Sequence, residues 1–301
     1  MLPQNNSHMK VAGFTFIRNA VKNDYAIVEA ITSILPICDE LIVAHGNSED
    51  DTLRLIESIH SPKIKIIQTI WNDELREGGR TFAEETNKAY KAISADMDWA
   101  FYIQGDECVH EKYLETIKNE MQICLNNKEI EGLLFNYKHF YGSYDFFAHS
   151  RRWYRREVRI IKNLADMHSY KDAQGFRYQN KKIKVKHINA FIYHYGWVKP
   201  PTGLNTKVRN FNQFYTKNDQ WIEETYPELA EFDYENADQL FKFTETHPKV
   251  MQERIVKSNW TFNFDPTKTQ QKLPFRRKLL AWFERITGTR PFEYKNYTKV
   301  A

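Results

Sequence analysis

Apolar positions in the first hundred residues follow two alternating periodicities. Short β-rich apolar runs, typical of buried strands, occupy residues 10–17, 40–44, 64–70 and 99–103. Between them, apolar side chains recur at helical spacing over residues 24–35, 50–59 and 81–93. Strands that alternate with helices of this length predict a parallel α/β sheet. Because ligands bind at the carboxyl ends of parallel strands, the polar residues that follow each strand become site candidates.

The pattern changes after residue 111. Expected elements are a helix at 112–124, an aromatic-rich strand at 132–141, a basic strand-like stretch at 151–163 and an alternating strand at 183–195. Residues 205–262 are expected to be mostly helical. No Ser/Gly/Pro linker separates the two halves. The fold class predicted is therefore α/β, with a mostly parallel sheet flanked by helices, an α+β second half and a helical C-terminal region.

Composition places the chain among ordinary globular proteins. It has 301 residues, of which 42% are hydrophobic, and this size suits one large domain or two small ones. The three cysteines are too few for a disulfide framework and suit a reducing compartment. No apolar run reaches the roughly 18 residues of a spanning helix, and the N-terminus lacks the pattern of a signal peptide. We expect a cytoplasmic protein.

The net charge of +4 is unevenly distributed. Residues 151–187 hold twelve Lys or Arg against three acids, and residues 272–290 hold six against Glu284. Such stretches favour phosphates, nucleic acid or an anionic membrane face as partners. Within the second stretch, residues 275–286 form an amphipathic pattern with basic flanks. This helix is expected either to pack on the domain or to make peripheral contact with the inner face of a membrane.

Three motifs carry candidate chemistry. Asp106 and Glu107 follow an apolar strand, where a carboxylate pair can hold a hard divalent cation, although a solvated turn that caps the next helix fits equally well. Residues 42–52 read as a strand, a glycine turn and an acidic helix start, which capping alone would explain. His194 ends an alternating strand and could bind a metal or a diphosphate, or simply pack among aromatic residues.

Taken in order, these motifs resemble a family 2 glycosyltransferase of the GT-A fold. The likeness covers residues 9–110 well and 130–200 more loosely. The family's turn Asp-x-Gly-Ser-Thr-Asp-x-Thr corresponds to the segment from His45 to Thr52, and its Asp-x-Asp motif corresponds to the segment from Gln104 to Asp106, with Glu107 following. Two positions depart from the pattern: His45 and Gln104 each stand where the family has Asp.

The resemblance implies a nucleotide-sugar-dependent glycosyltransferase of the hexosyltransferase type. It implies an inverting, Mn²⁺- or Mg²⁺-assisted transfer to a glycan or lipid-linked acceptor, in surface polysaccharide or lipopolysaccharide biosynthesis. A GT-A domain is predicted over residues 9–200, with a nucleotide-sugar-binding half at 9–110 and an acceptor half at 111–200. Residues 201–301 are predicted to form a helical extension that carries the basic amphipathic helix.

The resemblance also assigns site residues. Donor binding is expected from Phe16, Arg18, Asn19, His45, Asn47, Arg80, Asn87 and Asp106. Metal binding is expected from Asp106, Glu107 and His194. For the catalytic base that deprotonates the acceptor, the candidates are Asp172, which is preferred, then Glu157 and Asp145. Lys199 and Lys207 could hold phosphate or be merely exposed.

Other functions stay open. A nucleotidyltransferase would need a glycine-rich signature near the N-terminus. Residues 13–20 contain little glycine, which argues against this alternative. A polyanion binder could use residues 151–187, where basic and aromatic residues interleave. The absence of a recognisable nucleic-acid module argues against it, and no nucleic-acid partner is expected. A non-catalytic glycosyltransferase-like protein is the fourth alternative, kept open by the two departures from the family motifs.

Overall fold

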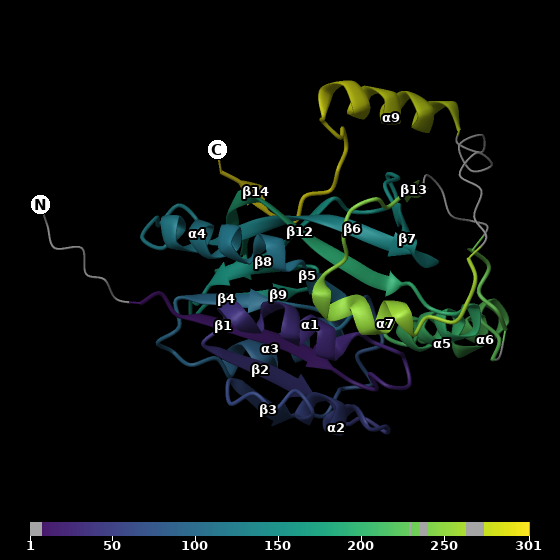
Figure 1. Ribbon diagram of the computed structural model, residues 1–301, viewed down its shortest axis with the longest axis horizontal. Coiled ribbons are helices and arrows are strands. Elements are labelled where there is room, and N and C mark those ends of the chain that lie inside the picture. The colour runs from purple at the N-terminus through teal and green to yellow at the C-terminus, as the bar shows by residue number, and fades with distance from the viewer. Residues whose placement is uncertain (1–7, 229, 235–239, 263–273, 301) are drawn as a thin grey trace, which may run out of the picture.

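The computed structural model describes residues 8–228, 230–234, 240–262 and 274–300. One large mixed sheet crosses the molecule, and most helices lie on its two faces (Figure 1). Its main path has the order β13-β7-β6-β8-β4-β1-β2-β3, with β12 joined to β6 and also to β5 and β14. The predicted α/β class is confirmed.

The first half of the sheet is parallel. Its strands are β1 (Val11–Ile17), β2 (Glu40–His45), β3 (Ile64–Gln68) and β4 (Trp99–Tyr102). The strand β1 pairs in parallel with β2 on one side and β4 on the other, and β2 pairs in parallel with β3. All four agree with the strands predicted from the apolar runs, to within two residues at each end. Their carboxyl ends therefore meet at one edge, as the alternation predicted.

Alternation along the strands supplies a core on each face. Val11 and Leu41 belong to one buried cluster and Phe14 and Ile42 to the other, because successive side chains point to opposite faces. The first face is covered by α1 (Ile27–Ile34), α2 (Thr52–Glu57) and α4 (Leu114–Cys124). The second is covered by α3 (Arg80–Lys91) and a small sheet of β9 (Met167–Tyr170), β10 (Gly175–Tyr178) and β11 (Lys181–Lys182).

The second half of the sheet is mostly antiparallel. Its strands are β5 (Glu107–Val109), β6 (Gly132–Tyr141), β7 (Ser143–Ala148), β8 (Arg156–Lys162) and β12 (Lys184–Trp197). The strand β8 joins β6 to β4 through antiparallel pairing on both sides. The long strand β12 runs parallel to β6 and antiparallel to β5. The predicted α+β half is thus continuous with the first sheet, as expected from the missing linker.

The described part of the C-terminal region is only partly helical. Its described helices are α5 (Pro201–Asn212), α6 (Asp219–Thr225), α7 (Gln252–Val256) and α9 (Phe275–Thr287), and a 3-10 turn spans Lys249–Met251. Two other 3-10 turns lie earlier in the chain, at Leu35–Ile37 and Glu111–Tyr113. Two short strands, β13 (Leu240–Lys242) and β14 (Thr298–Lys299), add to the main sheet at β7 and β12. Backbone pairing at a sheet edge needs no hydrophobic periodicity, so the sequence pattern missed both strands.

None of the described helices is long and apolar enough to cross a bilayer. The predicted division of the GT-A domain into halves at residue 110, and its predicted end at residue 200, stay predictions.

Candidate functional site

A cavity of about 1040 Å³ opens at the carboxyl ends of β1 and β4. Its lining includes residues 16–19, at the end of β1, and residues 104–106, just beyond β4. Helix α5 contributes a wall through Leu204 and Lys207, and the second half of the chain contributes a wall through Asp172. The site lies where the parallel-sheet rule placed it.

Asp106 is the centre of a polar cluster inside this cavity. Its Oδ2 accepts a hydrogen bond from Lys207 Nζ at 2.9 Å and lies 3.7 Å from His194 Nε2. Burial alone would raise the pKa of Asp106, but the charges of Lys207 and His194 outweigh it and hold that pKa well below its usual value. All three groups converge on Gly196, where an added Cβ would lie within 2.8 Å of each. A glycine is required for this close approach.

The orientation of His194 follows from its neighbour His139. The Nε2 of His139 is 2.8 Å from the carbonyl oxygen of Tyr154, which can only accept, so this nitrogen carries the proton. Burial, followed by the nearby His194 charge, lowers the pKa of His139 and keeps the ring neutral. His139 Nδ1 is then the acceptor for His194 Nδ1, 3.1 Å away. The Nε2 of His194 is thereby directed at the Asp106 carboxylate, where it could bind a cation.

Glu107, the sequence neighbour of Asp106, faces away from the cavity. It is fully buried, and its carboxylate receives two hydrogen bonds from Arg159, at 2.7 and 2.8 Å. Tyr137 donates a third at 2.8 Å, and the Gln104 backbone amide a fourth at 3.2 Å. The carboxylate is therefore occupied by protein donors. The structure does not bring Glu107 together with the other metal-ligand candidates, Asp106 and His194.

We expect Arg159→Met to destabilise the fold strongly. Arg159 is 1% exposed, so its removal leaves the Glu107 charge buried without a counter-ion. Such a loss costs about 3–5 kcal/mol of unfolding free energy. Urea denaturation followed by far-ultraviolet circular dichroism would measure it.

Two further variants test this ion-pair interpretation. The double variant Glu107→Gln with Arg159→Met should recover part of the loss, because no buried charge is left. Lys186→Met, which breaks a more exposed pair with Glu120, should change the unfolding free energy by no more than about 1 kcal/mol. Equal losses for Arg159→Met and Lys186→Met would contradict the prediction.

The structure divides the eight expected donor-binding residues into two groups. The cavity is lined by Phe16, Arg18, Asn19 and Asp106. The cavity lining does not include His45, Asn47, Arg80 or Asn87.

Three of these residues are hydrogen-bonded to other segments of the chain: His45 to Gln68, Asn47 to the Trp71 amide and Asn87 to the Ser169 amide. His45 Nδ1 lies 2.7 Å from Gln68 Oε1, and its Nε2 is buried without a partner among the described residues. The Asn87 side chain accepts a hydrogen bond from the Ser169 amide at 2.6 Å and so fastens β9 to α3. Arg80 is exposed at the start of α3.

The turn that resembles the family motif holds the loop after β1. Ser48 and Thr52 accept hydrogen bonds from the backbone amides of Asn19 and Ala20, at 3.0 and 2.7 Å. Asp50 accepts one from the amide of Lys22 at 2.7 Å. These polar side chains thus fix the shape of the loop after β1, whose residues line the cavity.

The three base candidates separate clearly by position. Asp172 lines the cavity and accepts a hydrogen bond from Tyr215 at 3.3 Å, and burial raises its pKa above 3.8. Glu157 and Asp145 do not line the cavity. Burial raises the pKa of Glu157 to about 8, and one of its oxygens has no hydrogen-bond partner among the described residues. Asp145 lies exposed on β7. Of the three base candidates, only Asp172 can therefore contact a molecule in the cavity.

Aromatic residues that sequence reasoning missed form one side of the cavity. Phe16, which it had identified, contacts Trp71 and Phe82, with ring centroids 5.7 and 5.9 Å apart. Phe214 packs on both Trp71 and Phe82, at 5.2 and 5.1 Å. Arg18 lies over the Trp71 ring, 5.6 Å from its centroid. The residues come from four separate segments, so no local pattern could have grouped them.

The basic stretch at 151–187 does not form a continuous exposed surface. Arg159 is paired with Glu107, Arg155 with Glu293 and Arg151 with Glu284. Several of its positive charges are thus matched within the protein. This arrangement gives no support to the alternative of a polyanion-binding module.

Comparisons with known proteins give structural likeness alone. No protein-family model and no curated protein sequence matches this chain. It is similar to S. aureus TarS, residues 1–349 in complex with UDP, at a TM-score of 0.39 and 15% identity over 72% of this chain and 69% of that one. Against another TarS structure, this chain covers only 39% of that chain's length.

Two synthases are similar at lower scores. Glucosyl-3-phosphoglycerate synthase from Mycobacterium tuberculosis, in complex with Mn²⁺, UDP and phosphoglyceric acid, gives a TM-score of 0.30 at 21% identity, covering 44% of each chain. Mannosyl-3-phosphoglycerate synthase from Rubrobacter xylanophilus gives 0.31 at 16% identity, over 44% of this chain and 41% of that one. The fold itself is read from the strand order: a parallel half joined to a mostly antiparallel half, with the cavity at the carboxyl ends of β1 and β4.

Proposed function

We propose that this protein is a nucleotide-sugar-dependent glycosyltransferase. The observation that carries the proposal is the convergence of Asp106, His194 and Lys207 inside a cavity that also contains Asp172. The Lys207 ammonium suits a diphosphate, and the separate Asp172 carboxylate suits a base. The motif resemblance around residues 42–52 and 104–107 supports the same activity.

The reaction would be a direct displacement with inversion. Asp172 removes the proton of an acceptor hydroxyl as that oxygen forms a bond to the anomeric carbon. The bond between the anomeric carbon and the diphosphate oxygen breaks at the same time, and the electron pair leaves with the nucleotide. Lys207 lies beside the Asp106 carboxylate and would stabilise the charge that develops on the leaving diphosphate.

A divalent cation fits this site in part. Asp106 offers carboxylate oxygens and His194 offers a free Nε2, and these would hold Mn²⁺ or Mg²⁺ together with diphosphate oxygens. Among the described residues there is no group of three or more His, Cys, Asp or Glu side chains that could form a closed metal site. Most remaining ligands would therefore come from the substrate or water. When bound, the cation would neutralise charge on the leaving group.

The acceptor side of the cavity suits a sugar. Trp153, Tyr154 and Trp197 line it, and flat aromatic rings stack on the apolar faces of sugar rings. Their indole and hydroxyl groups can also form hydrogen bonds with sugar hydroxyls. A glycan or a lipid-linked glycan is the acceptor class we propose, in surface polysaccharide or lipopolysaccharide synthesis.

Binding of a nucleoside diphosphate tests this proposal. We expect one nucleoside diphosphate and its sugar conjugates to raise the melting temperature by about 5 °C or more at saturation, because a ligand of the native state stabilises it by mass action. Differential scanning fluorimetry over a panel of nucleotides, with and without Mn²⁺, would measure the shift. Turnover would be followed as release of the nucleoside diphosphate.

The alternatives give different results in the same experiment. Stabilisation by nucleoside triphosphates, with release of pyrophosphate, would favour the nucleotidyltransferase. A specific shift without turnover on any acceptor tested would favour a non-catalytic protein. The donor site would be refuted if no nucleotide changed the melting temperature.

A further inference from the structure

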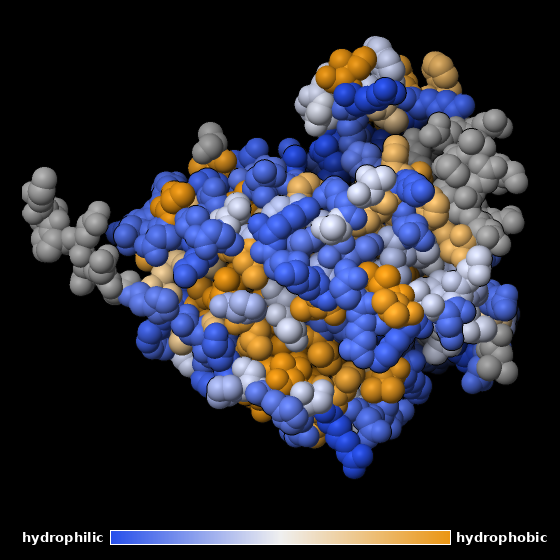
Figure 2. Space-filling model, viewed as in Figure 1, coloured by the Kyte–Doolittle hydropathy of each residue, from blue (hydrophilic) through white to orange (hydrophobic). Residues whose placement is uncertain are grey.

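Helix α9 turns its most hydrophobic face toward solvent. Trp282 is 60% exposed and Leu279 is 52% exposed, and no residue of the helix is buried. In Figure 2, apolar side chains lie beside basic ones on this helix, at the top of the molecule. The exposed apolar side chains, named here the α9 stripe, are Phe275, Leu279, Trp282, Phe283 and Ile286.

The geometry of the helix explains why these five residues share a face. Successive positions are about 100° apart around the axis, which gathers residues three, four, seven and eleven apart on one side. Leu280, Ala281 and Glu284 fall on the opposite side, and these are the half-buried residues of α9. The side toward the protein body is thus the less hydrophobic one. The sequence did not decide whether this stripe packs on the domain. In the structure it does not, and its side chains are exposed.

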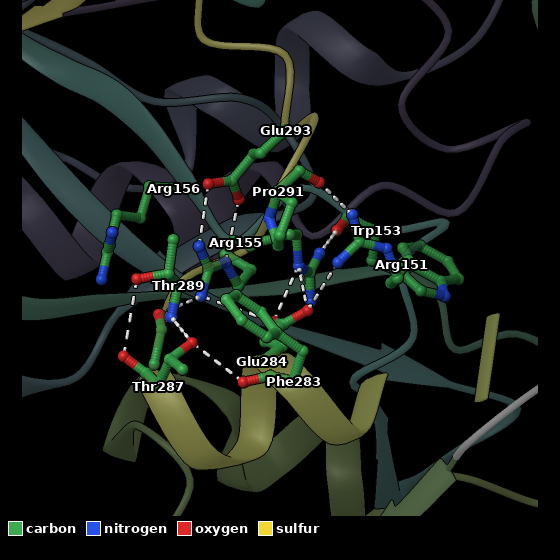
Figure 3. Close-up of polar contacts among 12 residues, drawn as sticks. Arg151, Trp153, Arg155, Arg156, Phe283, Glu284, Thr287, Thr289, Pro291 and Glu293 are labelled. Carbon is green, nitrogen blue, oxygen red and sulfur yellow. Dashed lines mark hydrogen bonds and ion pairs between the residues drawn. The ribbon is translucent and has the colours of Figure 1, made fainter. Parts of the chain in front are cut away.

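Ion pairs between Glu284 and Arg151, Arg155 and Arg290, named here the clasp, fix this orientation. Arg290 Nε donates to both carboxylate oxygens of Glu284, at 2.8 and 2.9 Å, and Arg151 Nη1 donates to one of them at 3.1 Å. Arg155 lies 3.4 Å from the same carboxylate and also binds Glu293 (Figure 3). Glu284 is the only acidic residue of α9, and the clasp turns it toward the body. The helix therefore cannot rotate without breaking several charge-assisted hydrogen bonds.

The charges left on the outside of α9 all have one sign. Arg276, Arg277, Lys278 and Arg285 are exposed and form no ion pair with the described part of the chain. By helical geometry, Arg276 borders the α9 stripe on one side, and Lys278 and Arg285 border it on the other. Long basic side chains in such border positions can extend to headgroups while their stems stay in apolar surroundings.

We propose that the α9 stripe and its basic borders dock this protein on an anionic lipid surface. An apolar face with Trp and Phe, flanked by cations, is what binds in the plane of the membrane interface. The thirteen-residue helix is about 20 Å long, which suits lying on a bilayer rather than crossing it. Two further aromatic side chains just beyond the helix, Phe292 and Tyr294, are also exposed. A second copy of the chain fits less well, because it would oppose like charges.

The clasp also connects the docking helix to the cavity. Arg290 Nη1 donates to the carbonyl oxygen of Trp153 at 2.8 Å, and Trp153 lines the cavity on its acceptor side. One short segment thus carries both a cavity wall and the attachment of α9. If the proposed transferase activity holds, this connection suits an acceptor held in the membrane, but the docking itself does not depend on that activity.

Vesicle flotation of the full chain tests the docking. We expect binding to phosphatidylcholine vesicles that contain phosphatidylglycerol, and little binding to pure phosphatidylcholine. The double variant Leu279→Ser with Trp282→Ser should reduce the bound fraction about tenfold or more, because it removes two large apolar groups. Ile123→Ser is the matched control, since Ile123 is 67% exposed on the distant helix α4.

Charge variants separate the two parts of the surface. Arg276→Glu with Lys278→Glu should weaken binding to anionic vesicles, and high salt should do the same to the unmodified chain. Lys118→Glu, an exposed change on α4, should leave binding unchanged. Circular dichroism would show that each variant is folded.

Three outcomes would overturn the proposal. The first is absence of binding by the unmodified chain to anionic vesicles. The second is equal binding by the stripe variant and the Ile123→Ser control. The third is a concentration-dependent dimer, seen by light scattering and lost in the stripe variant, without vesicle binding, which would assign the surface to a second copy of the chain.

Discussion

Asp106→Asn is expected to reduce sugar transfer by at least about 10³-fold in kcat/KM, which corresponds to about 4 kcal/mol of transition-state stabilisation. The substitution keeps the size of the side chain but removes the charge that holds Lys207 and faces His194. Lys207 would lose its charged partner beside the proposed diphosphate, and a bound cation would lose a carboxylate ligand. Steady-state measurement of nucleotide release would report the loss.

Nucleotide binding gives an independent check on Asp106. We expect the Mn²⁺-dependent part of the nucleoside diphosphate thermal shift to disappear in Asp106→Asn. Asp166→Asn, an exposed change outside the cavity, is the control and should behave like the unmodified chain. Retention of full activity and of the metal effect in Asp106→Asn would remove Asp106 from the proposed donor site.

Asp172→Asn is expected to reduce turnover by about 10²-fold to 10⁴-fold. It should leave nucleoside diphosphate binding unchanged. An amide cannot accept the proton of the acceptor hydroxyl, but it keeps the shape of the cavity wall and can still bind Tyr215. The comparison of turnover with the nucleotide thermal shift therefore separates the base from the donor site. A variant with lost binding and lost turnover would indicate a donor or structural role for Asp172 instead.

The pH dependence follows from the environment of Asp172. A base must be ionised to act, so activity should fall as the pH drops through the pKa of Asp172. Burial raises that pKa above 3.8, which moves the acidic limb of the profile to higher pH than an exposed aspartate would give. Asp145→Asn, at the exposed candidate outside the cavity, should leave the rate and the limb unchanged.

Much of the fold could be predicted because it depends on local periodicity. The apolar runs at residues 10–17 and 40–44 are strands because their side chains are buried on both faces of a parallel sheet. Ile27, Ile31 and Ile34 recur at helical spacing because they form the buried face of one helix. Strands β13 and β14 were not predicted, because short edge strands are fixed by backbone pairing and show no hydrophobic periodicity in the sequence.

The candidate site could be predicted only in part. Asp106 and Asp172 were identified, and both line the cavity. The motif resemblance also placed His45 and Asn87 at the donor site, yet their side chains are held by Gln68 and Ser169. A motif gives the position of a residue along the chain, whereas its hydrogen bonds depend on what the rest of the chain brings beside it.

By itself, the sequence determined the alternating α/β order, the edge of the sheet where the cavity opens and the amphipathic character of residues 275–286. Only the tertiary structure decided how adjacent residues differ in role. Asp106 meets Lys207, which lies 101 positions away, whereas Glu107 begins β5 and turns inward to Arg159. The same holds for α9, whose exposed stripe depends on Glu284 binding Arg151 and Arg155. Such contacts join distant segments, so no local pattern contains them.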